Sequence, residues 1–509
     1  MVEKKRGMNR FLDHIERVGN RLPDPLSLFV ILCVAVILVS WIAASIGIEV
    51  THPSNGQTIA VQSLLSKESI YRMLNSMVSN FAAFPPLGLV LVTMIGIGVA
   101  EQSGLISAGL KKLVMAVPKR LLTATLVFAG ITANLAADAG YVVLTPLGAM
   151  LFAAVGRHPI AGLAAVFAGV SGGFSANLFF TQLDPLLAGI STTAAHIMDP
   201  SYVVQPTANY YFNIISTFVL VIAGTWVTDY VVEPRLGKWQ REENSIDDDL
   251  SRLEPREKRG LWVAGVVFLL CLIITGWMVF PSDGILRSPE GGIEPFLNSL
   301  VPILMLTFLF CGIAYGLVAG TVKSDKDIAR MSSDSMATMG SYIVLAFIAS
   351  QFVAYFSWSN LGIVSAIAGA SGLQAIGLTG APLILTFIIV SAMINLLIGS
   401  ASAKWAIMGP VFIPMLMLMG YSPELTQAAY RVGDSTTNII TPLMPYFPII
   451  ISFAQKYDKK VGIGTLISVM LPYSIAFFVM WAILLIVWMV FGFPLGPDAP
   501  LYYTAPTGG

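Results

Sequence analysis

Long apolar segments separated by short polar ones run through almost the whole chain. A helix needs about 20 apolar residues to cross a bilayer core about 30 Å thick, and the segments 28–47 and 463–491 reach this length without a charged residue. The pattern predicts nine transmembrane spans, at 28–48, 86–103, 160–190, 209–231, 260–281, 296–320, 340–357, 424–454 and 463–492. The expected fold class is an all-α polytopic membrane protein.

Basic residues fall into clusters that indicate how the chain is oriented. Basic residues in short loops stay on the cytoplasmic side, and the N-terminal arm is itself basic. The other clusters lie at 111–120, 157–158, 323–330 and 456–460. All of them share one side only if 121–156 and 380–420 form re-entrant hairpins, the first from the cytoplasm and the second from outside. The N-terminus is then predicted to be cytoplasmic and the C-terminus periplasmic.

These elements predict a transport core set in a scaffold. Residues 1–85 form the arm, the first span and an amphipathic helix on the outer interface; 86–190 hold repeat 1 with hairpin 1; 191–339 are scaffold spans with a cytoplasmic linker at 233–259; 340–454 hold repeat 2 with hairpin 2; 455–509 are the last span and an outer tail.

Residues typical of turns and kinks recur in both hairpin regions at nearly constant spacing. Pro146, Gly156 and Pro159 recur 264 positions later as Pro410, Gly420 and Pro423, and Asn134 and Asn177 recur 261 positions later as Asn395 and Asn438. Any single match could merely reflect a helix kink, but five matches in order indicate an internal repeat. Because the hairpins enter from opposite faces, the repeat is expected to be inverted, as in many secondary transporters.

Composition narrows the classes of function. The chain is 56% hydrophobic and 11% charged with zero net charge, so we expect lipid contact and no nucleic-acid partner. Its three cysteines lie in apolar segments, which argues against disulfide or metal chemistry. The phosphate-binding motif GxxxxGK[ST] is absent from the sequence, so no direct ATP drive through such a loop is expected. No cofactor is expected beyond a coupling ion, Na⁺ or H⁺.

Four polar segments interrupt the apolar core regions and are candidates for a binding site. They are Asn134–Gly140 (NLAADAG), Ser171–Asn177 (SGGFSAN), Gly399–Ser402 (GSAS) and Gly433–Asn438 (GDSTTN). Broken backbone in hydrocarbon persists only where it lines a cavity or holds a ligand. The alternative is that small residues simply allow tight helix packing. The candidate ion-coupling residues are Asn134, Asp138, Asn177, Ser400, Ser402 and Asn438, of which Asn134, Asp138, Asn177 and Asn438 are candidate Na⁺ ligands.

Ionisable residues inside the membrane are costly and usually functional. Here they are Asp138, Asp184, Lys404, Arg431 and Asp434. Arg431 and Asp434 share a helix face and could neutralise each other, or Arg431 could bind a substrate carboxylate while Asp434 binds a donor or the coupling ion. Lys404 could occupy the place of a cation, extend to the outer face or pair with Asp184. Trp405 could stack on an aromatic or cationic group, or pack against a neighbouring helix.

Several motifs resemble the p-aminobenzoyl-glutamate transporter (AbgT) family. They are AADAGYVVLTPLGAMLFAAVGRHPIAGL, SGGFSANLFFTQLDPLLAGIS, VVEPRLGKWQ and RVGDSTTNIITPLMPY, and the likeness extends over nearly the whole chain. The resemblance implies an inner-membrane homodimer with nine helices and two re-entrant hairpins per protomer. It implies substrate-path roles for Asp184, Asn395, Trp405, Arg431 and Asp434, a helix-shaping role for Pro423, and ion-site roles for Asp138 and the asparagines.

The function expected is that of a secondary active transporter of small aromatic carboxylates. Export of p-aminobenzoate and sulfonamide antimetabolites, driven by an ion gradient, is preferred; the alternative is sodium-coupled import of p-aminobenzoyl-glutamate. An intramembrane hydrolase with Asp184 and Asp434 as its carboxylate pair, and a channel, are the remaining alternatives. An inverted repeat argues against the hydrolase, because hydrolysis does not require a site open to each face in turn.

Overall fold

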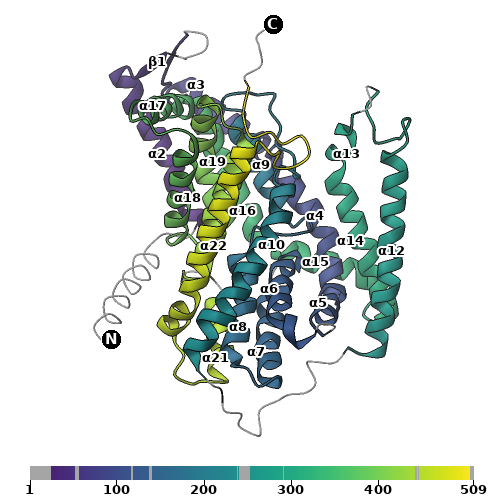
Figure 1. Cartoon of the computed structure of the whole chain (residues 1–509). Coiled ribbons are helices and arrows are strands. Elements are labelled where there is room, and N and C mark those ends of the chain that lie inside the picture. The colour runs from purple at the N-terminus through teal and green to yellow at the C-terminus, as the bar shows by residue number, and fades with distance from the viewer. Residues whose placement is uncertain are drawn as a thin grey trace.

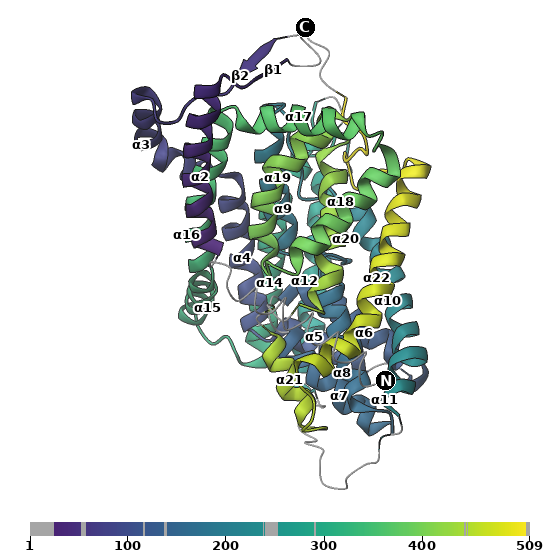
Figure 2. The same ribbon diagram turned by 90° about the vertical axis from the view of Figure 1, so that its left-hand side faces the viewer.

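The computed structural model describes residues 25–51, 57–115, 118–136, 140–237, 239, 253–289, 292–441, 444 and 446–504. Within them the chain forms a bundle of helices, most of which run along the long axis of the molecule (Figure 1). The described strands form one antiparallel hairpin, β1 (Glu49–Thr51) with β2 (Thr58–Ala60). This short hairpin lies at the upper end of the molecule (Figures 1 and 2), and the largely helical structure agrees with the expected all-α class.

Seven helical segments of the described chain are long and apolar enough to cross a membrane, or eight if a bent pair counts as one span. They include α2 (Pro25–Ile46), α4 (Pro85–Gln102), α10 (Tyr210–Val227), α12 (Pro255–Val279), α14 (Leu300–Ala319), α19 (Ala401–Leu418) and α22 (Ile463–Phe491). The bent pair is α15 (Asp325–Thr338) with α16 (Gly340–Trp358). The protein is therefore a multi-pass membrane protein, while the count of nine spans stays a prediction.

The first re-entrant segment, hairpin 1, turns back within the lower half of the molecule. It comprises α6 (Leu122–Thr132), a 3₁₀ turn (Ala133–Ala136), a π turn (Gly140–Leu144) and α7 (Thr145–Ala154). Its ends meet, because Arg157 Nη1, just after α7, donates to Thr123 Oγ1 at the start of α6 at 2.7 Å. In both views α7 lies at the lower end (Figures 1 and 2).

Hairpin 2 begins and ends at the opposite end of the molecule and turns back inside the bundle (Figure 2). It comprises α18 (Gly380–Asn395), a non-helical connection at 396–400 and α19 (Ala401–Leu418). Its ends also meet, since the Gly380 amide donates to the Tyr421 hydroxyl at 2.7 Å. The preceding helix, α17 (Leu361–Ala375), lies at the upper end in both views (Figure 2).

Two predicted spans are broken near the middle of the bundle. The first runs from α8 (Pro159–Phe167) through a π turn (Ala168–Gly172) and an irregular stretch to α9 (Leu183–Ala195). The second runs from α20 (Pro423–Asn438) through an irregular stretch to α21 (Phe447–Gln455). The break predicted near 171–177 is thus present, although it extends to residue 182.

The predicted break at Gly433–Asn438 is wrong, because these residues form the last turns of α20. Thr436 Oγ1 donates to the Val432 carbonyl at 2.8 Å and Thr437 Oγ1 to the Gly433 carbonyl at 3.2 Å. A hydroxyl that bonds to a carbonyl of its own helix does not have to unwind that helix. The helix therefore continues to Asn438, and the break begins after this residue. Similarly, α19 already begins at Ala401, capped by the Ser400 hydroxyl, which accepts from the Ala403 amide at 3.3 Å.

Other described elements complete the bundle. They are α3 (Lys67–Ala82), α5 (Leu105–Met115), a 3₁₀ turn (Lys119–Leu121), a π turn (Thr228–Val232), α11 (Glu233–Leu236) and α13 (Glu294–Asn298). The amphipathic helix predicted within 49–85 is confirmed as α3, where Leu74 and Val78 remain exposed. Helices α15 and α17 were not predicted, and much of the predicted linker 233–259 lies outside the described residues.

The turns that follow the two hairpins have the same local geometry. Gly156 and Gly420 both have positive φ, 78° and 86°, a conformation that side chains with a Cβ rarely adopt. Pro159 and Pro423 each occupy the first helical position of the next helix, where proline is favoured.

The GRHP and EPRLG motifs meet in an ion cluster at the base of hairpin 1. Arg157 Nη2 contacts Asp229 Oδ1 at 2.5 Å, and Arg157 Nε donates to Glu233 Oε2 at 3.0 Å. The two carboxylate side chains are 33% and 22% exposed, so the guanidinium neutralises two partly buried charges. The cluster therefore holds the hairpin against the end of α10.

We expect Arg157→Met to lower the free energy of unfolding by about 1–3 kcal/mol, since charge-assisted hydrogen bonds are lost and two carboxylates are left facing each other. The measurement is the melting temperature of the purified protein in detergent. Arg330→Met is the matched control, because that side chain is 65% exposed. Equal melting temperatures for the two variants would show that the cluster contributes nothing to stability.

Candidate functional site

Polar residues of hairpin 2 and of both broken spans converge inside the bundle. The Ser175 amide in the first break donates to Ser435 Oγ on α20 at 3.2 Å. Asn438 Nδ2 at the end of α20 donates to the Ser171 carbonyl at 3.4 Å. The first break therefore lies directly against the helix that carries Arg431 and Asp434.

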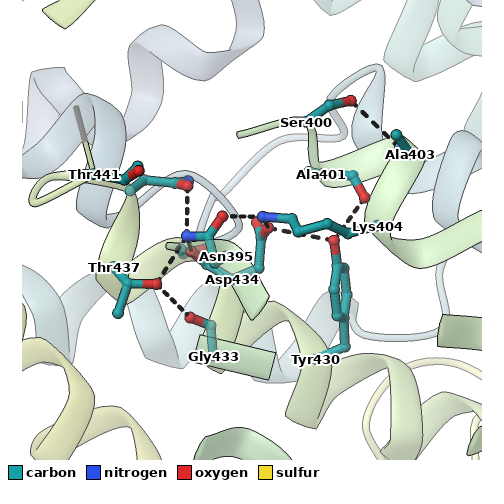
Figure 3. A network of polar contacts seen from close by, with 12 residues as sticks. Asn395, Ser400, Ala401, Ala403, Lys404, Tyr430, Gly433, Asp434, Thr437 and Thr441 are labelled. Atoms are coloured by element: carbon teal, nitrogen blue, oxygen red, sulfur yellow. Dashed lines mark hydrogen bonds and ion pairs between the residues drawn. The ribbon is translucent and has the colours of Figure 1, made fainter. Parts of the chain in front are cut away.

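One buried ion pair joins hairpin 2 to α20 (Figure 3). Lys404 Nζ on α19 lies 2.5 Å from Asp434 Oδ1, and the two side chains are 0% and 1% exposed. The Lys404 ammonium also donates to Asn395 Oδ1 at the end of α18. Tyr430, one turn before Asp434, donates to the Ala401 carbonyl at 2.6 Å and lies 3.3 Å from Asp434 Oδ1.

A second buried ion pair joins α20 to the first broken span. Arg431 Nη2 donates to Asp184 Oδ1 at 2.5 Å, and Asp184 Oδ2 accepts from the amide and hydroxyl of Thr181 at 2.7 and 3.1 Å. Arg431 Nη1 donates to the Ser175 carbonyl at 3.3 Å. The side-chain amide of Asn213 on α10 satisfies both its groups in one orientation. In it, the amide nitrogen donates to the Ser175 carbonyl at 3.3 Å and the amide oxygen accepts from Arg431 Nη1 at 2.9 Å.

Two stacked aromatic rings lie next to the Lys404–Asp434 ion pair. The Trp405 and Tyr430 ring centroids are 4.4 Å apart with planes 26° from parallel. Trp405 Nε1 donates to Ser191 Oγ at 2.9 Å, and Ser191 Oγ donates to Gln427 Oε1 at 2.6 Å. Gln427 in turn donates to Asn209 at 2.9 Å, so hydrogen bonds connect the stack to α9 and the start of α10.

The predicted asparagines occupy two neighbouring groups. Asn134 Nδ2 and Asn177 Nδ2 both donate to the Ile131 carbonyl at 3.1 Å, which brings hairpin 1 and the first break together. Asn438 Oδ1 instead accepts from Asn395 Nδ2 at 2.8 Å, beside the lysine pair. Ser400 and Ser402 lie at the start of α19 with their hydroxyls 3.3 Å apart. Asp138 lies outside the described residues.

Three pairing hypotheses from the sequence are wrong in this structure. Arg431 and Asp434 share a helix but each pairs with a residue of another segment. Lys404 therefore pairs with Asp434 and not with Asp184, nor does it extend to the outer face. Asp184 and Asp434 are each paired with a separate cation in this structure, whereas a carboxylate dyad of the hydrolase type requires two carboxylates that share a proton.

Gln427, Tyr430 and Ser191 also belong to this cluster, although they were not predicted from the sequence. The spacing of Gln427, Arg431, Asp434 and Asn438 along α20 is three or four residues, which is the spacing of one helix face, so this stripe could have been recognised. Ser191 had no such signal, because its role depends on Trp405, a residue 214 positions away. Pro423 begins α20 two turns before the ion pairs and contributes to helix geometry, not to this cluster.

Three polar atoms of the cluster are buried without a hydrogen-bond partner among the described residues. They are Arg431 Nε, Asp434 Oδ2 and Ser175 Oγ. Buried polar atoms almost always have partners, so these donors and acceptors are available to a ligand. The described part of the chain contains no group of three or more His, Cys, Asp or Glu side chains that could hold a metal ion. A cation bound at this site would therefore be held mainly by amide, hydroxyl and carbonyl oxygens.

The chain matches the AbgT transporter family over residues 10–503. It is 37% identical to the p-aminobenzoyl-glutamate transport protein of Escherichia coli strain K12 over 486 residues, 95% of each chain. Its structure is similar to that of the Alcanivorax borkumensis YdaH transporter, with 45% identity and a TM-score of 0.89 over 93% of this chain and 100% of that one.

It is also similar to Neisseria gonorrhoeae MtrF, described as illuminating a class of antimetabolite efflux pumps, with 47% identity and a TM-score of 0.91 over 96% of this chain and 100% of that one. The resemblance inferred from the sequence motifs is confirmed. Because the match extends over nearly the whole chain, this multi-pass membrane protein belongs to the AbgT family of transporters.

Proposed function

We propose that this protein is a secondary active carrier of small aromatic carboxylates in the bacterial inner membrane. The preferred substrates are p-aminobenzoate and the sulfonamide antimetabolites, moved outward at the expense of an ion gradient. The names of the E. coli and N. gonorrhoeae relatives support this class of substrate and outward transport, respectively. Sodium-coupled import of p-aminobenzoyl-glutamate is the alternative, because a carrier follows whichever gradients are imposed on it.

One observation carries the proposal: Arg431 Nε, Ser175 Oγ and Asp434 Oδ2 are buried without a partner among the described residues, and Asp434 contacts Tyr430 of the aromatic stack. A carboxylate would accept from Arg431 and Ser175, since guanidinium groups favour planar anions. An arylamine would donate to Asp434, and its ring would lie against Trp405. Trp405 is fully buried, so the site is closed to water in this conformation.

The opposed hairpins support an alternating-access mechanism. In the proposed topology nine spans and two inverted hairpins place the site near the membrane midplane, with the N-terminus cytoplasmic and the C-terminus periplasmic. The similar turns at Gly156 and Gly420 favour the inverted repeat. We further propose that the protein is a homodimer and that Na⁺ or H⁺ couples to transport, with Asn134, Asp138, Asn177 and Asn438 as candidate ion ligands.

The test is flux of labelled p-aminobenzoate and p-aminobenzoyl-glutamate in proteoliposomes with Na⁺, pH and voltage gradients imposed separately. Wild type is expected to show saturable counterflow, which a channel does not, and the effective gradient identifies the coupling ion. Asp434→Ala should reduce flux by tenfold or more, since a lost buried charge contact costs roughly 2–5 kcal/mol.

Asp334→Ala is the matched control, because Asp334 is exposed on α15; its flux should equal that of wild type. Faster flux of p-aminobenzoyl-glutamate than of p-aminobenzoate under an inward Na⁺ gradient would favour the import alternative. Unchanged flux of both substrates in Asp434→Ala would show that the substrate site lies elsewhere.

A further inference from the structure

The Lys404 ammonium lies where a transport protein would hold a monovalent cation. It contacts Asp434 Oδ1 at 2.5 Å and donates to Asn395 Oδ1, and it is completely buried (Figure 3). A carboxylate and an amide oxygen are the hard oxygen ligands that alkali and alkaline-earth cations prefer. Without the ammonium, Asp434 would be an uncompensated buried charge, which is strongly unfavourable.

The Asn395 oxygen is held toward this position by the rest of the side chain. Asn395 Nδ2 lies 2.5 Å from the Asp434 carbonyl oxygen, 2.8 Å from Thr437 Oγ1 and 2.8 Å from Asn438 Oδ1, so these three oxygens share its two N–H donors. All three partners are acceptors, or can act as one, so the amide nitrogen faces α20 and the amide oxygen faces Lys404. The oxygen is thus preorganised for a cation by three contacts that do not involve Lys404.

Asp434 has coordinating capacity that the lysine does not use. Its Oδ2 is buried and has no hydrogen-bond partner among the described residues. An ordinary structural ion pair normally satisfies both carboxylate oxygens. Asp434 therefore keeps one carboxylate oxygen that the ammonium does not contact.

We propose that Lys404 is a built-in cation, whose ammonium permanently occupies a Na⁺-type site formed by Asp434 and Asn395. This inference rests on the proposed transport function, and it means that the chain itself supplies the positive charge at this position. The wild-type protein is then expected not to bind Na⁺ between Asp434 and Asn395. This expectation does not depend on which ion binds near Asn134 and Asn177. Shortening Lys404 should open the site to Na⁺ and water.

The experiment compares purified wild type, Lys404→Ala and the double variant Lys404→Ala/Asp434→Asn in detergent. Melting temperature and the yield of monodisperse protein are measured in NaCl and in choline chloride at equal ionic strength. Lys404→Ala is expected to gain a saturable Na⁺-dependent rise of roughly 2–4 °C beyond any response of wild type. The double variant, which lacks the carboxylate, should lose this additional rise.

The inference is overturned if Lys404→Ala responds to Na⁺ no more than wild type does, or if the double variant retains the additional response. It is equally overturned if Lys404→Ala is aggregated in both salts while the double variant is monodisperse, because Na⁺ then cannot replace the ammonium. No substrate is needed, so a failure of the proposed function, seen as absent wild-type flux, is distinguishable from a failure of this inference.

Discussion

Replacing Arg431 by Met is expected to abolish transport and to lower the free energy of unfolding by about 3–5 kcal/mol, the usual cost of breaking a buried ion pair from one side. Asp184 would keep its charge in a site where its side chain is only 7% exposed. The Asp184 carboxylate would keep its two hydrogen bonds from Thr181, but it would lose the cation that neutralises its charge. Melting temperature in detergent and flux in proteoliposomes measure the two effects.

A double variant separates the structural from the functional contribution. Arg431→Met/Asp184→Asn removes both charges, and replacing a whole buried pair is often close to neutral for stability. Its melting temperature should recover toward that of wild type, whereas transport of a carboxylate should remain absent because the guanidinium is missing. Recovery of transport together with stability would mean that Arg431 only holds the two segments together.

Gly433→Ala is expected both to destabilise the protein and to reduce transport. A Cβ at Gly433 would lie 2.5 Å from the Ile388 carbonyl oxygen and 2.6 Å from Ser391 Cβ. These atoms belong to helix α18, so α18 and α20 would have to separate, at a cost of about 1–3 kcal/mol for overpacking. The same shift would pull Asn395 away from Asp434, and transport should fall by at least tenfold.

Gly372→Ala is the matched control, since a Cβ at this exposed position of α17 meets nothing within 4 Å. Alanine in a helix interior is favoured over glycine by roughly 0.5–1 kcal/mol, so this variant should melt at or above the wild-type temperature with normal flux. A Gly433→Ala protein that behaves like Gly372→Ala would show that the close approach of α18 and α20 is not required.

Several elements of the fold could be predicted from the local pattern of apolar and basic residues. Helices α2, α12 and α22 face an apolar solvent over most of their length, so their apolar runs are nearly uninterrupted and their bounds were predicted to within a few residues. The positions of the basic clusters predicted two hairpins that enter from opposite sides, because charge constrains orientation independently of hydrophobicity, and the two hairpins do begin and end at opposite ends of the bundle (Figure 2). Helix α15 was missed because its sequence is polar enough to resemble a loop.

The position of the second break shows where local patterns fail. The segment GDSTTN contains residues that favour turns, yet it remains helical because Thr436 and Thr437 bond to carbonyls of their own helix. Whether such residues unwind a helix or stay in it depends on the neighbouring segments. Here Ser474 on α22 donates to the Thr436 carbonyl at 2.7 Å, a contact that no sequence window contains.

The sequence by itself determined the family, through its motifs, and the membrane class, through the length of its apolar segments. The hairpins and the candidate site residues were predicted from charge placement and from the cost of polar groups in lipid. Only the tertiary structure decided the partners: Arg431 with Asp184, 247 positions away, and Asp434 with Lys404. The physical reason is that buried charges pair by distance in space. That distance is determined by how α9, α19 and α20 cross and rotate, which packing over the whole bundle decides.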